Sequence, residues 1–357
     1  MKNHKKVNEK LDFQGEPIYV GIDVHKKQWN VFIMSRCKEH KGFAQPPNAA
    51  ALGNYLRSNF PGATYYSVYE AGFCGFWPHE ELKKEGIHNL VVNPADVPSM
   101  DKEKKNKSDK VDCRKLCKGL RSGDLEGIHI PDRSELEDRE LVRLRIKLAR
   151  DERRCKCRIK GMLNFYGVEV PNANWSKCFI KWLKELELHY ETGTFALKTL
   201  IEELEQVSLL KNKVASQLRN RFIKNERYAH LIKCLYSIPG VGLITALIFL
   251  TELGDTSRFK RIDQLCSYIG LVPSLYSSGQ KELVGNLTTR RNRYILAVLI
   301  ESTWKAVGKD PVLMNTYHKL CKRMKGQEAI IRIARNLVAR MRYVLVNKTE
   351  YKLNVAA

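Results

Sequence analysis

Pro17-Ile-Tyr-Val-Gly-Ile-Asp23-Val is the stretch from which the fold of this 357-residue chain can be deduced. Its isoleucine and valine side chains alternate with Tyr19, Gly21 and Asp23, a period of two that predicts a β-strand. A carboxylate within such a strand is costly to bury unless it is paired, bound to a metal or placed at an open rim. Asp23 is therefore the first candidate functional residue.

The sequence that follows predicts four more strands and two helices. Alternating apolar residues indicate strands at 29–34, around 43, at 63–70 and at 88–93, and helical spacing indicates helices at 48–60 and 78–85. Glu70 ends one of these strands and precedes a loop containing two glycines. Open α/β sheets build their sites at such strand ends. Glu70 is therefore the second candidate.

A loop over 94–107 leads to Lys107-Ser-Asp109-Lys-Val-Asp112, which opens a helix predicted to end near residue 120. Carboxylates three residues apart project from the same face of a helix. Basic side chains crowd the same segment. They are Lys102, Lys104, Lys105, Lys107, Lys110, Arg114, Lys115 and Lys118. The combination suits a site that binds a cation and a polyanion together, although acid pairs with this spacing are also common on solvated helices.

The predicted order β-β-β-α-β-α-β-α, with acids on the first strand, the fourth strand and the last helix, resembles the ribonuclease-H-like fold. That resemblance implies that Asp23, Glu70, Asp109 and Asp112 form a quartet holding two Mg²⁺ ions for phosphoryl transfer. Oxygen ligands without histidine or cysteine suit Mg²⁺. We place His25 at the rim of this site. Lower-ranked alternatives for the acids are Asp96, Asp101 and Glu103.

The composition points to a polyanionic partner. Lysine and arginine outnumber aspartate and glutamate by 62 to 39, which gives a formal charge of +23. A large positive surplus is typical of nucleic-acid-binding proteins. A membrane is not expected as partner, because the longest apolar run, 243–250, is too short to span one. The charged N-terminus has no apolar segment after it, so we expect no signal peptide.

The ten cysteines are expected to be reduced thiols. Cys113 with Cys117, and Cys155 with Cys157, lack the usual spacing of zinc ligands, and no paired Cys/His set follows them. Burial on helices is the favoured interpretation of these residues.

Composition and periodicity divide the chain into four parts. Residues 1–16 are expected to be flexible, and 17–130 to form the α/β domain. Residues 131–228 predict two long charged helices, 132–165 and 195–222, separated by a short one at 175–188. Such helices suggest a helical hairpin or coiled-coil arm that self-associates or straddles a partner. Residues 229–350 form a helical C-terminal domain.

Two motifs in the C-terminal domain suggest contact with nucleic acid. Ile-Pro239-Gly240-Val-Gly242 lies between apolar helices and matches a helix-hairpin-helix turn, whose backbone N–H groups grip phosphate without reading bases. A plain interhelical turn is the alternative. The hydroxyl-rich segment 270–281 is predicted to be a loop, in which Ser277 or Ser278 could attack phosphate. Most Ser-Ser-Gly segments, however, are only turns.

Taken together, these segments closely resemble the DEDD-type insertion-sequence transposases related to the Piv DNA invertase. The resemblance covers nearly the whole chain and rests on an ordered set of motifs. They are Tyr-Val-Gly-Ile-Asp23-Val, Tyr-Glu70-Ala, Val-Asn93-Pro94, Lys107-Ser-Asp109-Lys-Val-Asp112, Ile-Pro239-Gly240-Val-Gly242, Gly270-Leu-Val-Pro273 and Ser278-Gly279.

This resemblance implies a RuvC-like N-terminal domain, a coiled-coil connector and a C-terminal transposase domain. It implies a composite site in which a serine, Ser278 before Ser277, forms a covalent link to DNA while the Mg²⁺-bound quartet assists. Further implied partners are donor and target DNA, a structured guide (bridge) RNA and other copies of the chain in a dimer or tetramer. A cytoplasmic, nucleoid-associated location in a bacterium or archaeon is also implied. The residues expected to contact nucleic acid are Lys107, Lys110, Arg114, Pro239, Gly240, Gly242, Arg290 and Asn292.

Two other functions use the same residues differently. A RuvC-like structure-specific nuclease needs the quartet but no serine, so it would leave hydrolysed ends without a protein–DNA adduct. A non-catalytic nucleic-acid-binding protein needs neither. If alanine at Asp23 or Asp112 left all DNA chemistry intact, both enzyme hypotheses would lose their site. The positive charge predicts salt-dependent binding in all three cases and does not distinguish them.

Overall fold

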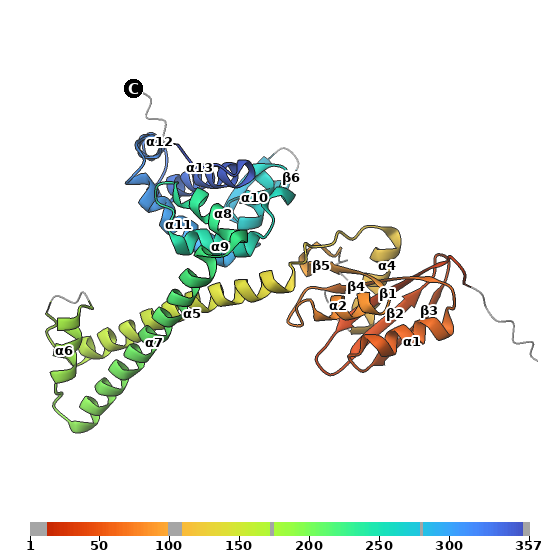
Figure 1. The fold of residues 1–357 in the computed structure, drawn as a ribbon, viewed down its shortest axis with the longest axis horizontal. Coiled ribbons are helices and arrows are strands. Elements are labelled where there is room, and N and C mark those ends of the chain that lie inside the picture. The colour runs from red at the N-terminus through yellow and green to blue at the C-terminus, as the bar shows by residue number, and fades with distance from the viewer. Residues whose placement is uncertain (1–12, 99–108, 172–174, 279–280, 353–357) are drawn as a thin grey trace, which may run out of the picture. The chain divides into compact units, whose positions relative to one another are not determined.

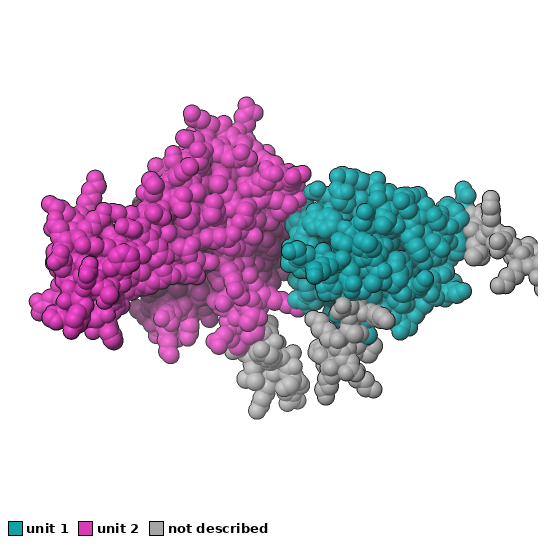
Figure 2. Space-filling view, turned by 90° about the horizontal axis from the view of Figure 1, so that it is seen from below, with its two compact units in different colours: residues 1–130 teal, residues 131–357 magenta. Residues whose placement is uncertain are grey.

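A computed structural model of the chain describes residues 13–98, 109–171, 175–278 and 281–352. The chain divides into two compact units, residues 1–130 and residues 131–357 (Figure 2). Residues 99–108, with Lys107, lie outside the described residues, as do the side chains of Asp109, Lys110, Ser277 and Ser278. None of the described helices is long and apolar enough to cross a bilayer.

The first unit is built on a five-stranded sheet with the order β3-β2-β1-β4-β5. Strands β1 (Pro17–Val24), β2 (Trp29–Met34) and β3 (Glu39–Gln45) are antiparallel neighbours, whereas β4 (Thr64–Glu70) and β5 (His88–Val92) run parallel to β1. All five strands were predicted from sequence periodicity, so the mixed α/β fold of this part is confirmed.

Helices lie on both faces of this sheet. Ile18, Val20 and Ile22 are fully buried in a core that also contains residues of α1 (Ala49–Asn59) and α2 (Trp77–Lys84). Helix α4 (Asp109–Ser122) packs on the opposite face, where Leu116 joins Val68 of β4 in a smaller core. Successive side chains of β1 therefore point to opposite faces of the sheet, and helices cover both faces.

One expectation about the N-terminus is wrong for its last residues. Residues 13–16 were expected to be flexible with the rest of the N-terminal segment, but their backbone is hydrogen-bonded to the loop between α1 and β4. The N–H groups of Phe13 and Gly15 donate to the carbonyls of Pro61 and Gly62, and the Phe13 ring packs against Phe60 at 5.1 Å. The aromatic side chain of Phe13 is what anchors this segment.

In the second unit, α5 (Arg133–Phe165) and α7 (Glu191–Ile223) lie side by side as a long arm, with α6 (Lys177–Glu185) at its far end (Figure 1). The arm has its own apolar core, which includes Ile159, Leu163 and Leu204. The side chain of Asp132 accepts a hydrogen bond from the N–H of Glu135 and the Glu135 side chain bonds back, a capping box that begins α5.

The remaining helices pack around α9 (Leu243–Leu253), whose last nine residues are all buried. They are α8 (Glu226–Tyr236), α10 (Ile262–Ile269), α11 (Arg293–Val307), α12 (Pro311–Cys321) and α13 (Gly326–Asn347). The boundary that the sequence suggested at 228/229 falls inside α8. The arm and the C-terminal helices accordingly belong to one compact unit.

The prediction of a loop over 270–281 is wrong. Residues 273–278 form β6 (Pro273–Ser278), which pairs antiparallel with β7 (Lys281–Leu287). Leu275 lies opposite Val284 and Tyr276 opposite Leu283, so apolar residues of the two strands are paired across the hairpin. The many serines concealed this pattern, because hydroxyl-rich composition is also typical of turns.

Candidate functional site

Two of the predicted acids lie on neighbouring strands. β1 and β4 are parallel and Ile22 pairs with Tyr69, so the next residues in this register are Asp23 and Glu70. Side chains two apart on a strand share a face. Asp23 therefore shares the α4 face with Gly21, and Glu70 shares it with Val68. The structure thus brings both carboxylates to one edge and one face of the sheet.

Helix α4, which packs on this face, carries Asp112 beside its contact with β1. The next residue, Cys113, is buried against the sheet, and burial raises the pKa of its thiol to about 11. The carboxylate of Asp23 contributes to this rise in pKa, and so does that of Asp112. Both charges are therefore close to the same sulfur atom, and Asp23 and Asp112 flank the β1–α4 contact.

His25 is closer to the site than its expected position at the rim suggests. Its Nε2 lies 3.0 Å from Oδ2 of Asp23, and both side chains are partly exposed to solvent. The sequence signal for this contact was the spacing of two residues on one strand, which places both side chains on the same face.

The donor atoms fit a magnesium site in type. Asp23, Glu70 and Asp112 offer only carboxylate oxygens, the ligands that Mg²⁺ prefers. Asp109 begins α4 three residues before Asp112, but its side chain lies outside the described residues. Among the side chains that are described, no three acids, histidines or cysteines lie close enough together to hold one ion.

Gly21 permits the close packing that places Asp112. A Cβ atom at this position would lie 1.9 Å from the carbonyl oxygen of Cys113 and 2.6 Å from the backbone nitrogen of Cys117. These are backbone atoms of α4 and cannot rotate away as a side chain could. The sequence around Gly21 does not reveal this role, because the helix that meets it is almost a hundred residues away.

We therefore expect Gly21→Ala to displace α4 from the sheet. Overpacking of this kind costs about 1–3 kcal/mol or somewhat more, and the displacement would separate Asp112 from Asp23. The free energy of unfolding, measured by urea titration, should fall accordingly. Gly42→Ala on β3 is the control, because its nearest neighbour is the rotatable ring of Phe32. Equal stability of the two variants would contradict this role.

Predicted contacts with nucleic acid have different surroundings in the two units. Arg114 pairs with Glu39 of β3 and its guanidinium lies 5.7 Å from the centre of the Phe32 ring, while Arg290 is exposed. Gly240 has a φ of +88°, and a Cβ there would lie 2.5 Å from the nitrogen of Ala306 in α11. Gly242 begins α9 with open space around it.

The two candidate nucleophiles lie at the end of β6. In the backbone register Ser277 faces Glu282 and Ser278 faces Lys281, the first residue of β7. Gly279 and Gln280, between the strands, lie outside the described residues. Ser278 and Lys281 are thus the last described pair of this hairpin, and both serines remain candidates.

Comparison with known proteins gives the family. Residues 20–168 match the DEDD transposases of the IS110 type, and residues 232–319 match the transposases of the IS116/IS110/IS902 family. The first match contains the four acids, and the second contains the Pro239–Gly242 turn and the β6–β7 hairpin. This chain belongs to the IS110/IS116 family of transposases. The resemblance found from the sequence is thereby confirmed at the level of the family.

Relatives from several bacteria agree with this assignment. A putative transposase (y4qE) of Sinorhizobium fredii is 28% identical over 67% of this chain, and the transposase for insertion sequence element IS1111A of Coxiella burnetii is 25% identical over 69%. The chain spans 58% and 65% of the length of these two relatives. A probable family 20 transposase of Pseudomonas aeruginosa is 22% identical over 79% of this chain and 81% of its own length.

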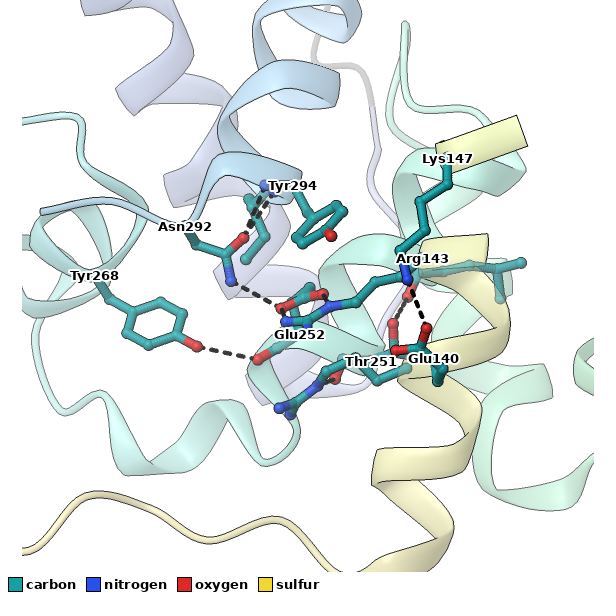
Figure 3. A network of polar contacts seen from close by, with 11 residues as sticks. Glu140, Arg143, Lys147, Thr251, Glu252, Tyr268, Asn292 and Tyr294 are labelled. Carbon is teal, nitrogen blue, oxygen red and sulfur yellow. Dashed lines mark hydrogen bonds and ion pairs between the residues drawn. The ribbon is translucent and has the colours of Figure 1, made fainter. Parts of the chain in front are cut away.

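A polar network in this transposase connects the arm to the segment that follows the β6–β7 hairpin (Figure 3). Glu252, near the end of α9, is 2% exposed and accepts two hydrogen bonds from Arg143 of α5, at 2.6 and 2.8 Å. Asn292 donates to the same carboxylate at 2.9 Å, and Tyr268 donates to the Glu252 carbonyl. The network therefore joins α5, α9, α10 and α11.

Asn292 was predicted to contact nucleic acid, but the structure gives its amide a structural role. The side-chain oxygen accepts hydrogen bonds from the N–H groups of Tyr294 and Ile295 and so caps α11, while its nitrogen donates to Glu252. The guanidinium of Arg143 also lies 4.6 Å from the centre of the Tyr294 ring. We therefore assign Asn292 and Glu252 to positioning the start of α11, where the segment that follows the β6–β7 hairpin ends.

Proposed function

We propose that this transposase cuts and rejoins DNA through a serine nucleophile, assisted by divalent metal held by acids of the first unit. The observation that carries the proposal is the gathering of Asp23 and Glu70 at one edge of the sheet, with α4 packed across the same face beside Asp112. Membership of a DEDD transposase family supports it.

In this proposal, Asp23, Glu70, Asp109 and Asp112 hold Mg²⁺. The bound metal would offset negative charge on the oxygens of the reacting phosphodiester. His25 holds the Asp23 carboxylate by their 3.0 Å contact and so restricts its orientation. The close approach of α4 at Gly21 fixes the position of the helix that carries the last two acids.

Ser278 is the proposed nucleophile, with Ser277 as its competitor. The hydroxyl releases its proton to solvent while its oxygen bonds to the phosphorus of the DNA strand. The bond from phosphorus to the 3′ oxygen breaks, and that oxygen takes a proton to become a free hydroxyl. The product is a covalent phosphoserine link that a second 3′ hydroxyl can reverse, so the strand is rejoined without hydrolysis.

The partners proposed are donor and target DNA, a structured guide RNA and other copies of the chain. Their support is the family resemblance and the positive charge of the chain. Guide RNA would supply the sequence specificity by base pairing, so that the protein need only grip phosphates. Lys107, Lys110, Arg114, Arg290 and the backbone of the Pro239–Gly242 turn are the proposed contacts.

A covalent-capture assay tests this function. Full-length protein is incubated with Mg²⁺, RNA transcribed from the flank of its element and end-labelled donor DNA, and the mixture is separated on a denaturing gel. We expect a shifted protein–DNA band that is lost in Ser278→Ala. Ser274→Ala, in the same strand, is the matched control and should keep the band.

Each other outcome changes the assignment. A band that survives Ser278→Ala but disappears in Ser277→Ala would make Ser277 the nucleophile. Nicking that requires metal but gives no adduct with any variant would overturn the serine mechanism and leave a RuvC-like nuclease.

A further inference from the structure

In the second unit the arm meets the helices around α9 (Figure 1). A basic groove lies at this junction. Its volume is about 900 Å³, and it is lined by α5 and α7 on one side and by the Pro239–Gly242 turn, α9 and α11 on the other. The groove is therefore shared between the arm and the C-terminal helices, two parts of one compact unit.

Positive charge dominates the lining of this groove. The six cationic side chains that line it are Arg145, Arg150, Arg153, Arg219, Lys305 and Lys309. Glu301 is the one acidic residue among the described residues of the lining, and it lies 3.5 Å from Lys305. Because like charges repel each other across a concave surface, a cluster of this kind favours an anionic ligand.

Most groove cations form no ion pair with the residues that the structure describes. Arg153, Arg219 and Lys309 form no ion pair with any described residue, and the buried Nε of Arg145 meets no hydrogen-bond acceptor there. Arg150 lies over the ring of Tyr294, 5.6 Å from its centre.

Other cations on the same two helices are neutralised. Arg143 pairs with Glu252, Arg158 with Glu203, and Arg221 with Asp138. Of the arm cations without an ion pair to a described residue, four gather in this groove, whereas the exposed Lys160, Lys198 and Lys213 lie elsewhere on the two helices. The gathering of unpaired cations in one hollow points to an external anion as their partner.

The start of α9 contributes backbone donors to the same groove. Gly242 caps this helix without a side-chain acceptor, and no acid lies in its first turn. Leu243, Ile244 and Thr245 also line the groove. The first N–H groups of a helix have no partners within it and carry partial positive charge, so they reinforce the attraction of the cations for phosphate.

We infer that this groove binds the phosphate backbone of a DNA duplex independently of sequence. Arg145 and Arg153 are eight residues apart on α5, about 12 Å along the helix. Each DNA strand carries a phosphate about every 3.4 Å of axis, so this row of cations spans roughly three or four phosphates. Among the described residues of the lining there is no asparagine or glutamine, the side chains that pair with adenine edges.

This inference deepens the proposed function, because it assigns a DNA-holding surface outside the acids and the serines. It also predicts that the arm itself takes part in binding DNA. The binding can be measured without divalent metal and without cleavage, so the groove and the proposed chemistry can fail separately.

The test compares two double variants of the full-length protein. Arg153→Gln with Arg219→Gln removes two exposed groove cations. Arg154→Gln with Lys213→Gln removes two exposed cations from the same helices outside the groove, so both variants lose the same net charge. Fluorescence anisotropy with a labelled random-sequence DNA duplex, in EDTA and at several salt concentrations, gives the dissociation constants.

The groove variant should bind about 10- to 30-fold more weakly at 0.15 M salt, and its log–log salt slope should fall by about 1.8, because each phosphate contact contributes about 0.9. The control variant should stay within about twofold of the unchanged protein. Equal weakening of both variants would overturn the inference. A groove variant that binds the DNA duplex normally but loses affinity for an RNA duplex of the same length would also overturn it, and would assign the groove to RNA.

Discussion

Replacing Asp112 by asparagine is expected to slow metal-dependent DNA cleavage by about 100- to 1,000-fold while the first unit keeps its fold. Asparagine has nearly the same shape but no charge, so it binds a divalent metal far more weakly. A metal ion stabilises the charge of a phosphoryl-transfer transition state by several kcal/mol, and about 1.36 kcal/mol corresponds to a tenfold change in rate. Asp112 is only partly buried, so the substitution leaves no large cavity.

Single-turnover cleavage of labelled donor DNA at saturating protein measures this effect, and anisotropy in EDTA measures binding separately. Asp124→Asn is the matched control, since Asp124 is an exposed acid shortly after the end of α4. It should cleave at the rate of the unchanged protein. If Asp112→Asn cleaves as fast as this control, the metal site proposed at the β1–α4 contact is wrong.

The architecture around Asp112 could be predicted because local periodicity determines it. Alternation located all five strands, and the resemblance to the ribonuclease-H-like fold implied that Asp23 and Glu70 belong to one site. The sheet has them at the ends of parallel neighbouring strands. The face that each acid occupies followed from the same alternation. The region matched to the DEDD transposases contains all four acids.

Contacts between distant segments could not be predicted in this way. The clash that an alanine at Gly21 would cause depends on how closely α4 approaches β1. The Glu252 network depends on an arginine more than a hundred residues earlier. The β6–β7 hairpin was local but was missed, because its serines resemble turn residues in composition.

The same reason explains why the basic groove was not foreseen. Runs of lysine and arginine occur along both arm helices, and the sequence does not show which of them are paired. Arg153 and Arg154 are adjacent in sequence, yet Arg154 pairs with Asp151 whereas Arg153 lines the groove. Only the three-dimensional pairing separates the neutralised cations from those available to a ligand.

Arg143→Met is expected to destabilise the second unit by about 3 kcal/mol. Glu252 is 2% exposed, so its carboxylate would lose two charged hydrogen bonds without gaining access to water. Removing one partner of a buried ion pair costs about 3–5 kcal/mol, and the lower end applies because Arg143 is 31% exposed. Urea unfolding of the full chain, followed by circular dichroism at a helical wavelength, measures the change in the second unit.

Two further variants identify the cause. Arg158 is on α5 like Arg143, but its ion pair with Glu203 of α7 is exposed. Arg158→Met should therefore cost less than about 1 kcal/mol. Adding Glu252→Gln to Arg143→Met removes the unpaired charge yet keeps an acceptor for Asn292, so the double variant should be more stable than Arg143→Met alone. If the double variant is no more stable, the loss comes from packing of the arginine against Tyr294 and not from the buried charge. Recovery of stability would instead show that a single carboxylate makes α9 depend on the arm, which explains why the arm and the C-terminal helices form one unit.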